Sequence, residues 1–200
     1  MENEKVAFNE MFETLREKLS RRDPADVAEK AGVQWDAAAK VWRFETFGRS
    51  VELAFPALEC TPELEDWHLL TLLQYLLLAD GALLDRNPML FGEQVDGMVR
   101  GVGFDRKVEQ TMRMQVGKLD QSVVEERCLS LGGAPVKTNA DISYEFWFMP
   151  RYPVMLKLWF ADEDDPASGR LLLAKSCNHY LPVEPSLFVG ELIINTLLGR

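Results

Sequence analysis

Cysteine is scarce in this sequence: Cys60, Cys128 and Cys177 are the only three in 200 residues, and they lie far apart. The spacing excludes a CxxC pair for zinc, an iron–sulfur cluster or a redox disulfide, and the odd number argues against a disulfide framework. The N-terminus is polar and acidic, whereas a secretory signal needs a basic start followed by an apolar stretch. We therefore expect free thiols and a cytoplasmic protein.

Long hydrophobic runs and an excess of positive charge are also lacking. The most apolar window, residues 69–79, is well short of the ~20 residues that a membrane span requires. Lys and Arg number 22 against 32 Asp and Glu, which gives a formal net charge of -10. An acidic surface repels the phosphates of nucleic acids and anionic lipids. We expect neither a nucleic acid nor a membrane as a partner.

Recognisable catalytic motifs are missing as well. The sequence contains no GxSxG, no HExxH and no set of kinase motifs. Gly97, Gly101 and Gly103 suggest a phosphate loop, but Arg106 stands where the last glycine of GxGxxG belongs. The sequence identifies no cofactor.

The composition that is present is that of a folded chain, with 47% hydrophobic and 27% charged residues. At this length we expect a single domain over residues 1–200. Helical spacing of apolar residues, aspartate caps and glycine stops predict helices over residues 4–20, 24–31, 62–79, 105–117, 120–131 and 187–198. The helix over 62–79 is predicted from Thr61-Pro62, and those beginning at Asp105 and Asp120 from their capping carboxyl groups.

Strands are indicated by alternating apolar residues in two parts of the chain. Residues 40–55 read as a hairpin around Gly48, with residues 33–35 as a further strand before it. Residues 142–148, 154–160 and 171–174 read as an antiparallel meander, and residues 80–103 as irregular chain with one short strand. The sequence predicts an α+β fold: an antiparallel sheet of about five strands, ending in the C-terminal meander and covered by helices.

The meander separates two groups of candidate site residues. At one end of the sheet, Asp141, Asp162 and Glu163 could hold a hard cation, although an acidic stretch followed by Pro166 is also typical of a solvated loop. At the other end, Arg151, Cys177 and His179 would suit an anion or a thiol reaction, although the more common explanation of two of them is a buried cysteine beside a surface histidine.

A strand of about six residues places these two ends ~20 Å apart, so they should not share one site. We expect Arg151 to lie closer to His179 than either lies to Asp162. The five tryptophans, Trp35, Trp42, Trp67, Trp147 and Trp159, indicate either an aromatic pocket or ordinary core packing.

Several C-terminal segments carry a family resemblance: Asp141 to Pro153, Leu158 to Glu163, the Leu171 strand and Leu181-Pro182-Val183-Glu184. Together with the leucine-rich helix around Tyr75, they resemble a bacterial and archaeal family known only as a domain of unknown function, family 3786. The resemblance spans most of the chain. It implies no activity, substrate or catalytic residue.

These observations favour a ligand-binding or accessory protein without catalysis. The partners left open are a small anionic ligand at Arg151, Cys177 and His179, or another protein. The alternative is a hydrolase assisted by a divalent cation at the acidic loop. Stabilisation by a specific divalent ion would favour the alternative.

Overall fold

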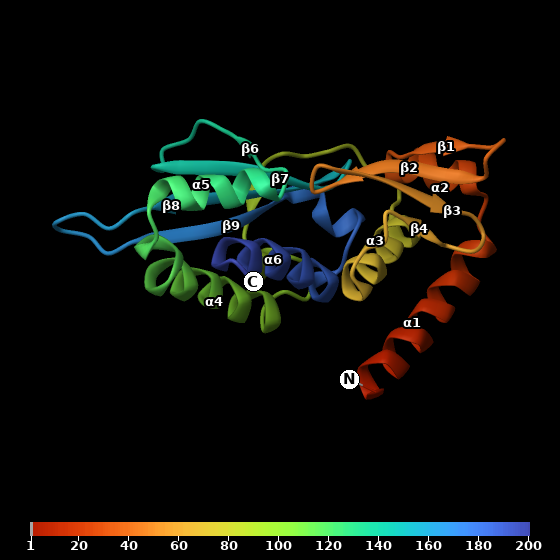
Figure 1. The fold of residues 1–200 in the computed structure, drawn as a ribbon, viewed down its shortest axis with the longest axis horizontal. Helices are drawn as coiled ribbons and strands as arrows, with labels where there is room; N and C mark the ends of the chain where they lie inside the picture. The colour runs from red at the N-terminus through yellow and green to blue at the C-terminus, as the bar shows by residue number, and fades with distance from the viewer. Residues whose placement is uncertain (1) are drawn as a thin grey trace.

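Two antiparallel sheets lie side by side in one layer, with helices beneath them (Figure 1). The computed structural model describes residues 2–200, and the side chains of residues 5–200. The four-stranded sheet has the order β1-β2-β3-β4 and the five-stranded sheet the order β5-β9-β8-β7-β6. The strands are β1 (Gln34–Asp36), β2 (Val41–Thr46), β3 (Arg49–Ala54), β4 (Cys60–Thr61), β5 (Pro88–Met89), β6 (Ala134–Pro135), β7 (Ile142–Met149), β8 (Tyr152–Trp159) and β9 (Ser168–Ala174).

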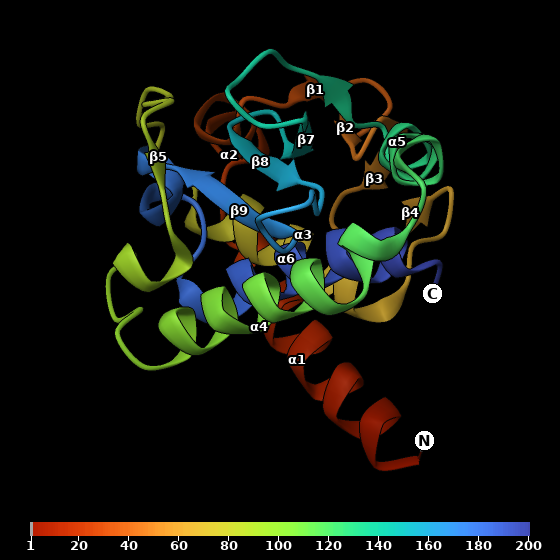
Figure 2. The same ribbon diagram turned by 90° about the vertical axis from the view of Figure 1, so that its left-hand side faces the viewer.

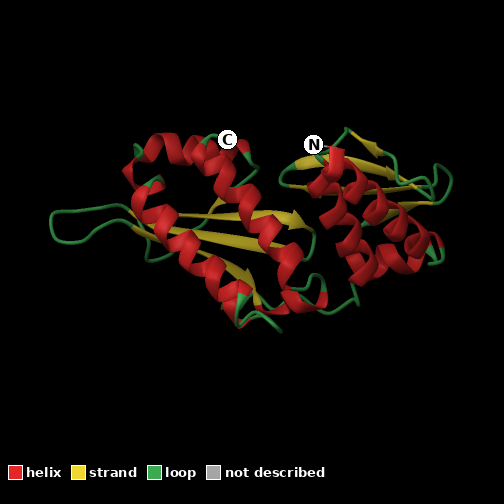
Figure 3. Cartoon of the chain, turned by 90° about the horizontal axis from the view of Figure 1, so that it is seen from below, coloured by secondary structure: helices red, strands yellow, loops and turns green. Residues whose placement is uncertain are grey.

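The helices gather on one side of this layer, where they cover the sheets in Figure 3. They are α1 (Glu2–Ser20), α2 (Pro24–Ala31), α3 (Asp66–Leu78), α4 (Arg100–Met114), α5 (Gln121–Ser130) and α6 (Val183–Leu198), with short 3-10 turns at Phe91–Glu93, Val116–Lys118 and Lys175–His179. Figure 2 shows the N-terminal half of α1 extending away from the rest of the chain. Among residues 2–200, no helix combines the length and the apolar character needed to cross a lipid bilayer.

Alternation along the strands decides which side chains face the helices. In β2, Trp42, Phe44 and Thr46 are buried, whereas Arg43 and Glu45 point to the opposite face. In β8, Val154, Leu156 and Leu158 are completely buried. The helices cover the inner faces of both sheets, so the outer faces carry the polar side chains that remain accessible.

The two sheets are joined at the hairpin turn between β2 and β3. The N–H of Phe47 donates to the carbonyl oxygen of Trp147 in β7 at 2.8 Å. Beneath this bond the buried His68 ring lies 2.8 Å from the Thr46 hydroxyl, through Nε2, and packs against the rings of Phe47 and Phe148. Residues of both sheets belong to one continuous hydrophobic core.

The α+β class and the meander are confirmed. β7, β8 and β9 pair antiparallel in sequence order, and the predicted hairpin forms β2 and β3, with β1 beside it. Asp23 caps α2 through its side chain, and Gly32 ends that helix at φ 73°. The N-terminal strands form a sheet of their own instead of joining the meander.

Three helix starts were predicted wrongly. α3 begins at Asp66 and not at Pro62, because Cys60 and Thr61 pair with β3. α4 begins at Arg100, and the carboxylate of Asp105 accepts the N–H groups of Phe91 and Gly92 from a different segment. α6 begins at Val183, where Pro185 fits the first turn because that turn has no partner for its N–H groups. Asp120 does precede α5, but its side chain makes no capping hydrogen bond.

Candidate functional site

Arg151, in the turn between β7 and β8, holds neighbouring main chain together. Its Nη1 donates to the carbonyl oxygens of Gly81 (3.0 Å) and Ala82 (3.4 Å), and its Nη2 donates to that of Glu29 (3.2 Å). These carbonyl groups lie in the last turn of α2 and just after α3, where helix dipoles attract a cation. The guanidinium is therefore engaged by the fold itself.

His179 reaches the same segment, since its Nδ1 lies 2.7 Å from Oδ2 of Asp80. This hydrogen bond is the main cause that lowers the pKa of Asp80. Asp162 stands beyond the far end of β8, in the loop before β9. The predicted placement of Arg151 near His179 and away from Asp162 is confirmed, whereas an anion site there stays a prediction.

Replacing Arg151 with methionine should lower the free energy of unfolding by about 2 kcal/mol, because several hydrogen bonds to a charged donor are lost. Urea unfolding monitored by circular dichroism measures the change. Arg170→Met on the exposed part of β9 serves as the control and should change stability much less. Equal losses in the two variants would contradict the structural role of Arg151.

Cys177 is buried, and its thiol is hydrogen bonded neither to Arg151 nor to His179. Its Sγ donates to Sδ of Met89 at 3.7 Å, and burial raises the pKa of the thiol to about 12. Burial raises the pKa of Cys128 to about 12 as well. A nucleophilic cysteine needs a thiolate, so neither thiol is activated for catalysis.

Alkylation of the native protein should therefore modify Cys60 first, since it is the only cysteine that is partly exposed. Cys128 and Cys177 should react only after denaturation, when all three thiols titrate without a reducing agent. Mass spectrometry of peptides after a short exposure to iodoacetamide checks the order. Rapid native labelling of Cys177 would show that this thiol is accessible.

The acidic end uses its carboxylates to close the loop between β8 and β9. Asp141 accepts the N–H of Phe160 at 2.7 Å, and Asp162 accepts the N–H groups of Asp165 (2.7 Å) and Asp164 (3.0 Å). The last two bonds lower the pKa of Asp162. Glu163 is exposed beside them. Across residues 5–200 no three His, Cys, Asp or Glu side chains are grouped to hold a metal ion, and a cation site at Asp141, Asp162 and Glu163 stays a prediction.

A different place, the junction of the two sheets, combines a hollow with accessible polar groups. A groove of about 560 Å³ lies over the outer face of β2 and β3 and is bounded by Trp147 and Pro150. Its volume falls in the range of small-molecule sites. The sheet register explains its lining: Gln34, Arg43 and Glu52 lie in one row across β1, β2 and β3, and Glu45 faces Ser50 in the next outward row.

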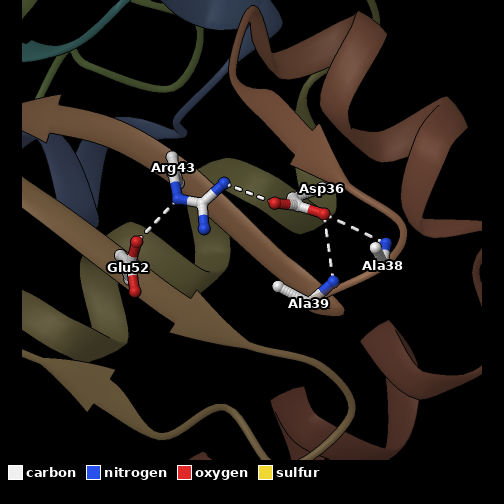
Figure 4. A network of polar contacts seen from close by, with 5 residues as sticks. All are labelled: Asp36, Ala38, Ala39, Arg43 and Glu52. Atoms are coloured by element: carbon white, nitrogen blue, oxygen red, sulfur yellow. Dashed lines mark hydrogen bonds and ion pairs between the residues drawn. The ribbon is translucent and has the colours of Figure 1, made fainter.

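Arg43 is the centre of the groove's polar network (Figure 4). Its Nε donates to Glu52 and its Nη1 to Asp36, both at 2.6 Å. Asp36 also accepts the N–H groups of Ala38 and Ala39, which with Arg43 lower its pKa. The two carboxylates raise the pKa of Arg43, with Glu52 contributing most. These contacts fix the guanidinium on the floor of the groove.

Trp147 forms the wall opposite this row. The β7–β8 register shifts between Trp147 and Met149, and such an irregularity changes the direction of a side chain. The Arg86 guanidinium carbon lies 5.5 Å from the centroid of the Trp147 ring, and its Nη2 pairs with Glu145 at 2.5 Å. Trp147 thus supports a cation and also lines the groove.

The model of a domain of unknown function, DUF3786, matches residues 23–196. The chain belongs to the DUF3786 family. The earlier resemblance to this family is confirmed. No curated protein and no solved structure matches the chain significantly.

The DUF3786 match covers every residue of the groove. It begins after the end of α1, so that helix lies outside the matched region. Sequence reasoning missed Arg43, Glu45 and Glu52, because alternating charges on a hairpin are typical of any solvated strand face. Of the tryptophans, Trp42 is completely buried and Trp147 is the one that lines the groove. The outward position of Trp147 in β7 was the available signal.

Proposed function

We propose that this DUF3786 protein is a binding or accessory protein without catalysis, and that it takes its ligand in the groove between Trp147 and the Arg43 row. The observation that supports this most strongly is the geometry of the groove. A fixed guanidinium, exposed carboxylates and an indole face one hollow of about 560 Å³. A few placed polar groups beside an aromatic wall are typical of ligand sites.

The other candidate positions support binding less well. The hydrogen-bond donors of Arg151 bind carbonyl oxygens, and the acidic-loop carboxylates Asp141 and Asp162 accept main-chain N–H groups. By contrast, Glu45 and Ser50 are exposed at the groove. An added molecule would therefore displace fewer existing contacts at Glu45 and Ser50 than at Arg151 or in the acidic loop.

A fragment titration followed by NMR tests the proposal. Small cationic, anionic and neutral probes are added in separate mixtures, and the indole N–H signal of Trp147, assigned with a Trp147→Phe variant, is followed. We expect at least one mixture to shift this signal and the amides of β2 and β3. Shifts confined to the β8–β9 loop, or stabilisation by a divalent cation there, would favour the hydrolase alternative. No shift at Trp147 with any mixture would overturn the proposal.

A further inference from the structure

The charges around the groove are unequal. Of the residues that line the groove, Glu45 and Glu52 are carboxylates and Arg43 is the one guanidinium; Asp36 pairs with Arg43 from outside the lining. Arg43 is already shared by Asp36 and Glu52. Among residues 5–200, neither an ion pair nor a side-chain hydrogen bond reaches Glu45, which is exposed. An anion entering the groove would meet this excess of negative charge, whereas a cation would reduce it.

At the junction of the two sheets, carboxylates already hold two guanidinium groups, those of Arg43 and Arg86. Arg43 lies between two carboxylates, 2.6 Å from each. Arg86 combines one carboxylate, Glu145, with the face of Trp147. The Glu145 side chain is only 10% exposed, so this pair is a built part of the sheet surface. Carboxylate and indole together are thus a combination that this surface uses to hold an organic cation.

Glu45 and Trp147 offer the same two kinds of group: Glu45 forms no ion pair among residues 5–200, whereas the Trp147 ring already lies 5.5 Å from the Arg86 guanidinium carbon. Glu45 and Trp147 both line the groove. Glu45 precedes Phe47 by two residues, about 7 Å along the strand, and Phe47 is hydrogen bonded to the main chain of Trp147 at 2.8 Å. A flat or extended cation could therefore contact the indole and the carboxylate at once.

We infer that the ligand of the groove carries an ammonium or guanidinium group, held by Glu45 and by the indole of Trp147. This inference rests on the proposed function and specifies its ligand chemistry. Such a group belongs either to a free polyamine or to a lysine or arginine side chain of a partner protein. In this arrangement Arg43 does not contact the ligand. It keeps its ion pairs with Glu52 and Asp36 at the edge of the site.

Titrations with spermidine and with the peptide acetyl-Gly-Arg-Gly-amide test the inference, with Trp147 followed by NMR at low and at physiological salt. We expect both probes to shift the Trp147 indole signal and Glu45→Gln to weaken binding at least fivefold. Glu126→Gln is the matched control, because it removes the same charge from an exposed position on α5. Tighter binding of spermidine would identify a polyamine, and tighter binding of the peptide a side chain of a partner.

Two results would overturn the inference. Equal weakening by Glu45→Gln and Glu126→Gln would show general attraction to a chain of net charge -10. Shifts at Trp147 with acetate or a neutral aromatic probe, but with neither cation, would keep the groove as a site and reject a cationic ligand. Unchanged circular dichroism of Glu45→Gln excludes loss of fold as the cause of weaker binding.

Discussion

Gly132→Ala should lose about 3 kcal/mol of unfolding free energy. Gly132 has φ 69°, a left-handed conformation that costs a residue with Cβ about 1–2 kcal/mol. A Cβ there would also lie 2.5 Å from the carbonyl oxygen of Phe47 and 2.7 Å from the nitrogen of Gly48. These atoms are main chain at the junction of the sheets, so they cannot move aside cheaply. Urea unfolding measures the loss.

Gly103→Ala provides the matched control. Gly103 lies inside α4, and apart from the adjacent backbone of that helix a Cβ at this position meets no atom within 4 Å. Alanine is favoured over glycine in a helix interior, so this variant should gain about 0.5–1 kcal/mol. Similar changes of stability in both variants would mean that Gly132 is not pressed against the β2–β3 turn.

Stability should fall by about 3 kcal/mol as the pH is lowered from 7.5 to 4, through the protonation of His68 in the unfolded chain. Burial lowers the pKa of His68 from 6.5 to about 4 in the folded protein. Between these pH values His68 is protonated in the unfolded chain but not in the folded protein, so proton binding stabilises the unfolded state. The stabilising effect is complete above pH 6.5 and is lost as the pH falls towards 4, at about 1.4 kcal/mol for each pH unit.

His68→Gln isolates this effect, because glutamine can still hydrogen bond to Thr46 but does not titrate. The difference in unfolding free energy between the wild-type protein and the variant should shrink by about 3 kcal/mol between pH 7.5 and pH 4. Acidic groups contribute equally to both curves and cancel in the difference. A difference that stays constant over this range would show that His68 has an ordinary environment.

Local signals made part of the fold predictable from the sequence. The Asp23 cap and Gly32 stop enclose α2 because both act on the adjacent turn. The meander is equally local, since β7, β8 and β9 alternate clearly and are joined by short connections. Such elements depend on contacts between residues that are close in the sequence, and these contacts can be predicted from the sequence pattern.

Other elements depended on distant partners and were missed. Thr61-Pro62 has the composition of a helix start, yet Thr61 pairs with Glu52 of β3. Asp105 has the composition of a cap, yet its carboxylate binds N–H groups 13 and 14 residues earlier. In each case a tertiary contact satisfied the polar group that local reasoning had assigned to a helix end.

The candidate site was harder to predict from the sequence than the fold, because it depends on more contacts between distant residues. Arg151 and His179 could be placed at one end of the sheet, because the meander alone fixes that geometry. That Arg151 is occupied by carbonyl oxygens of Gly81 and Glu29 could not be inferred, since those atoms belong to other elements. The groove depends on Trp147 meeting the β2–β3 hairpin, a contact across one hundred residues of chain.

The hydrogen bond between Phe47 and Trp147 can form only after Trp147 has been synthesised, so the junction of the two sheets forms late in translation. The N-terminal hairpin leaves the ribosome long before its partner strand, and at 5–20 residues per second the intervening chain takes about 5–20 s to synthesise. During that interval the turn at Phe47 has no covering strand, and the wall of the groove does not exist. A nascent chain halted before residue 142 should therefore expose this edge to chaperones, and a ligand of the groove can stabilise only the completed protein.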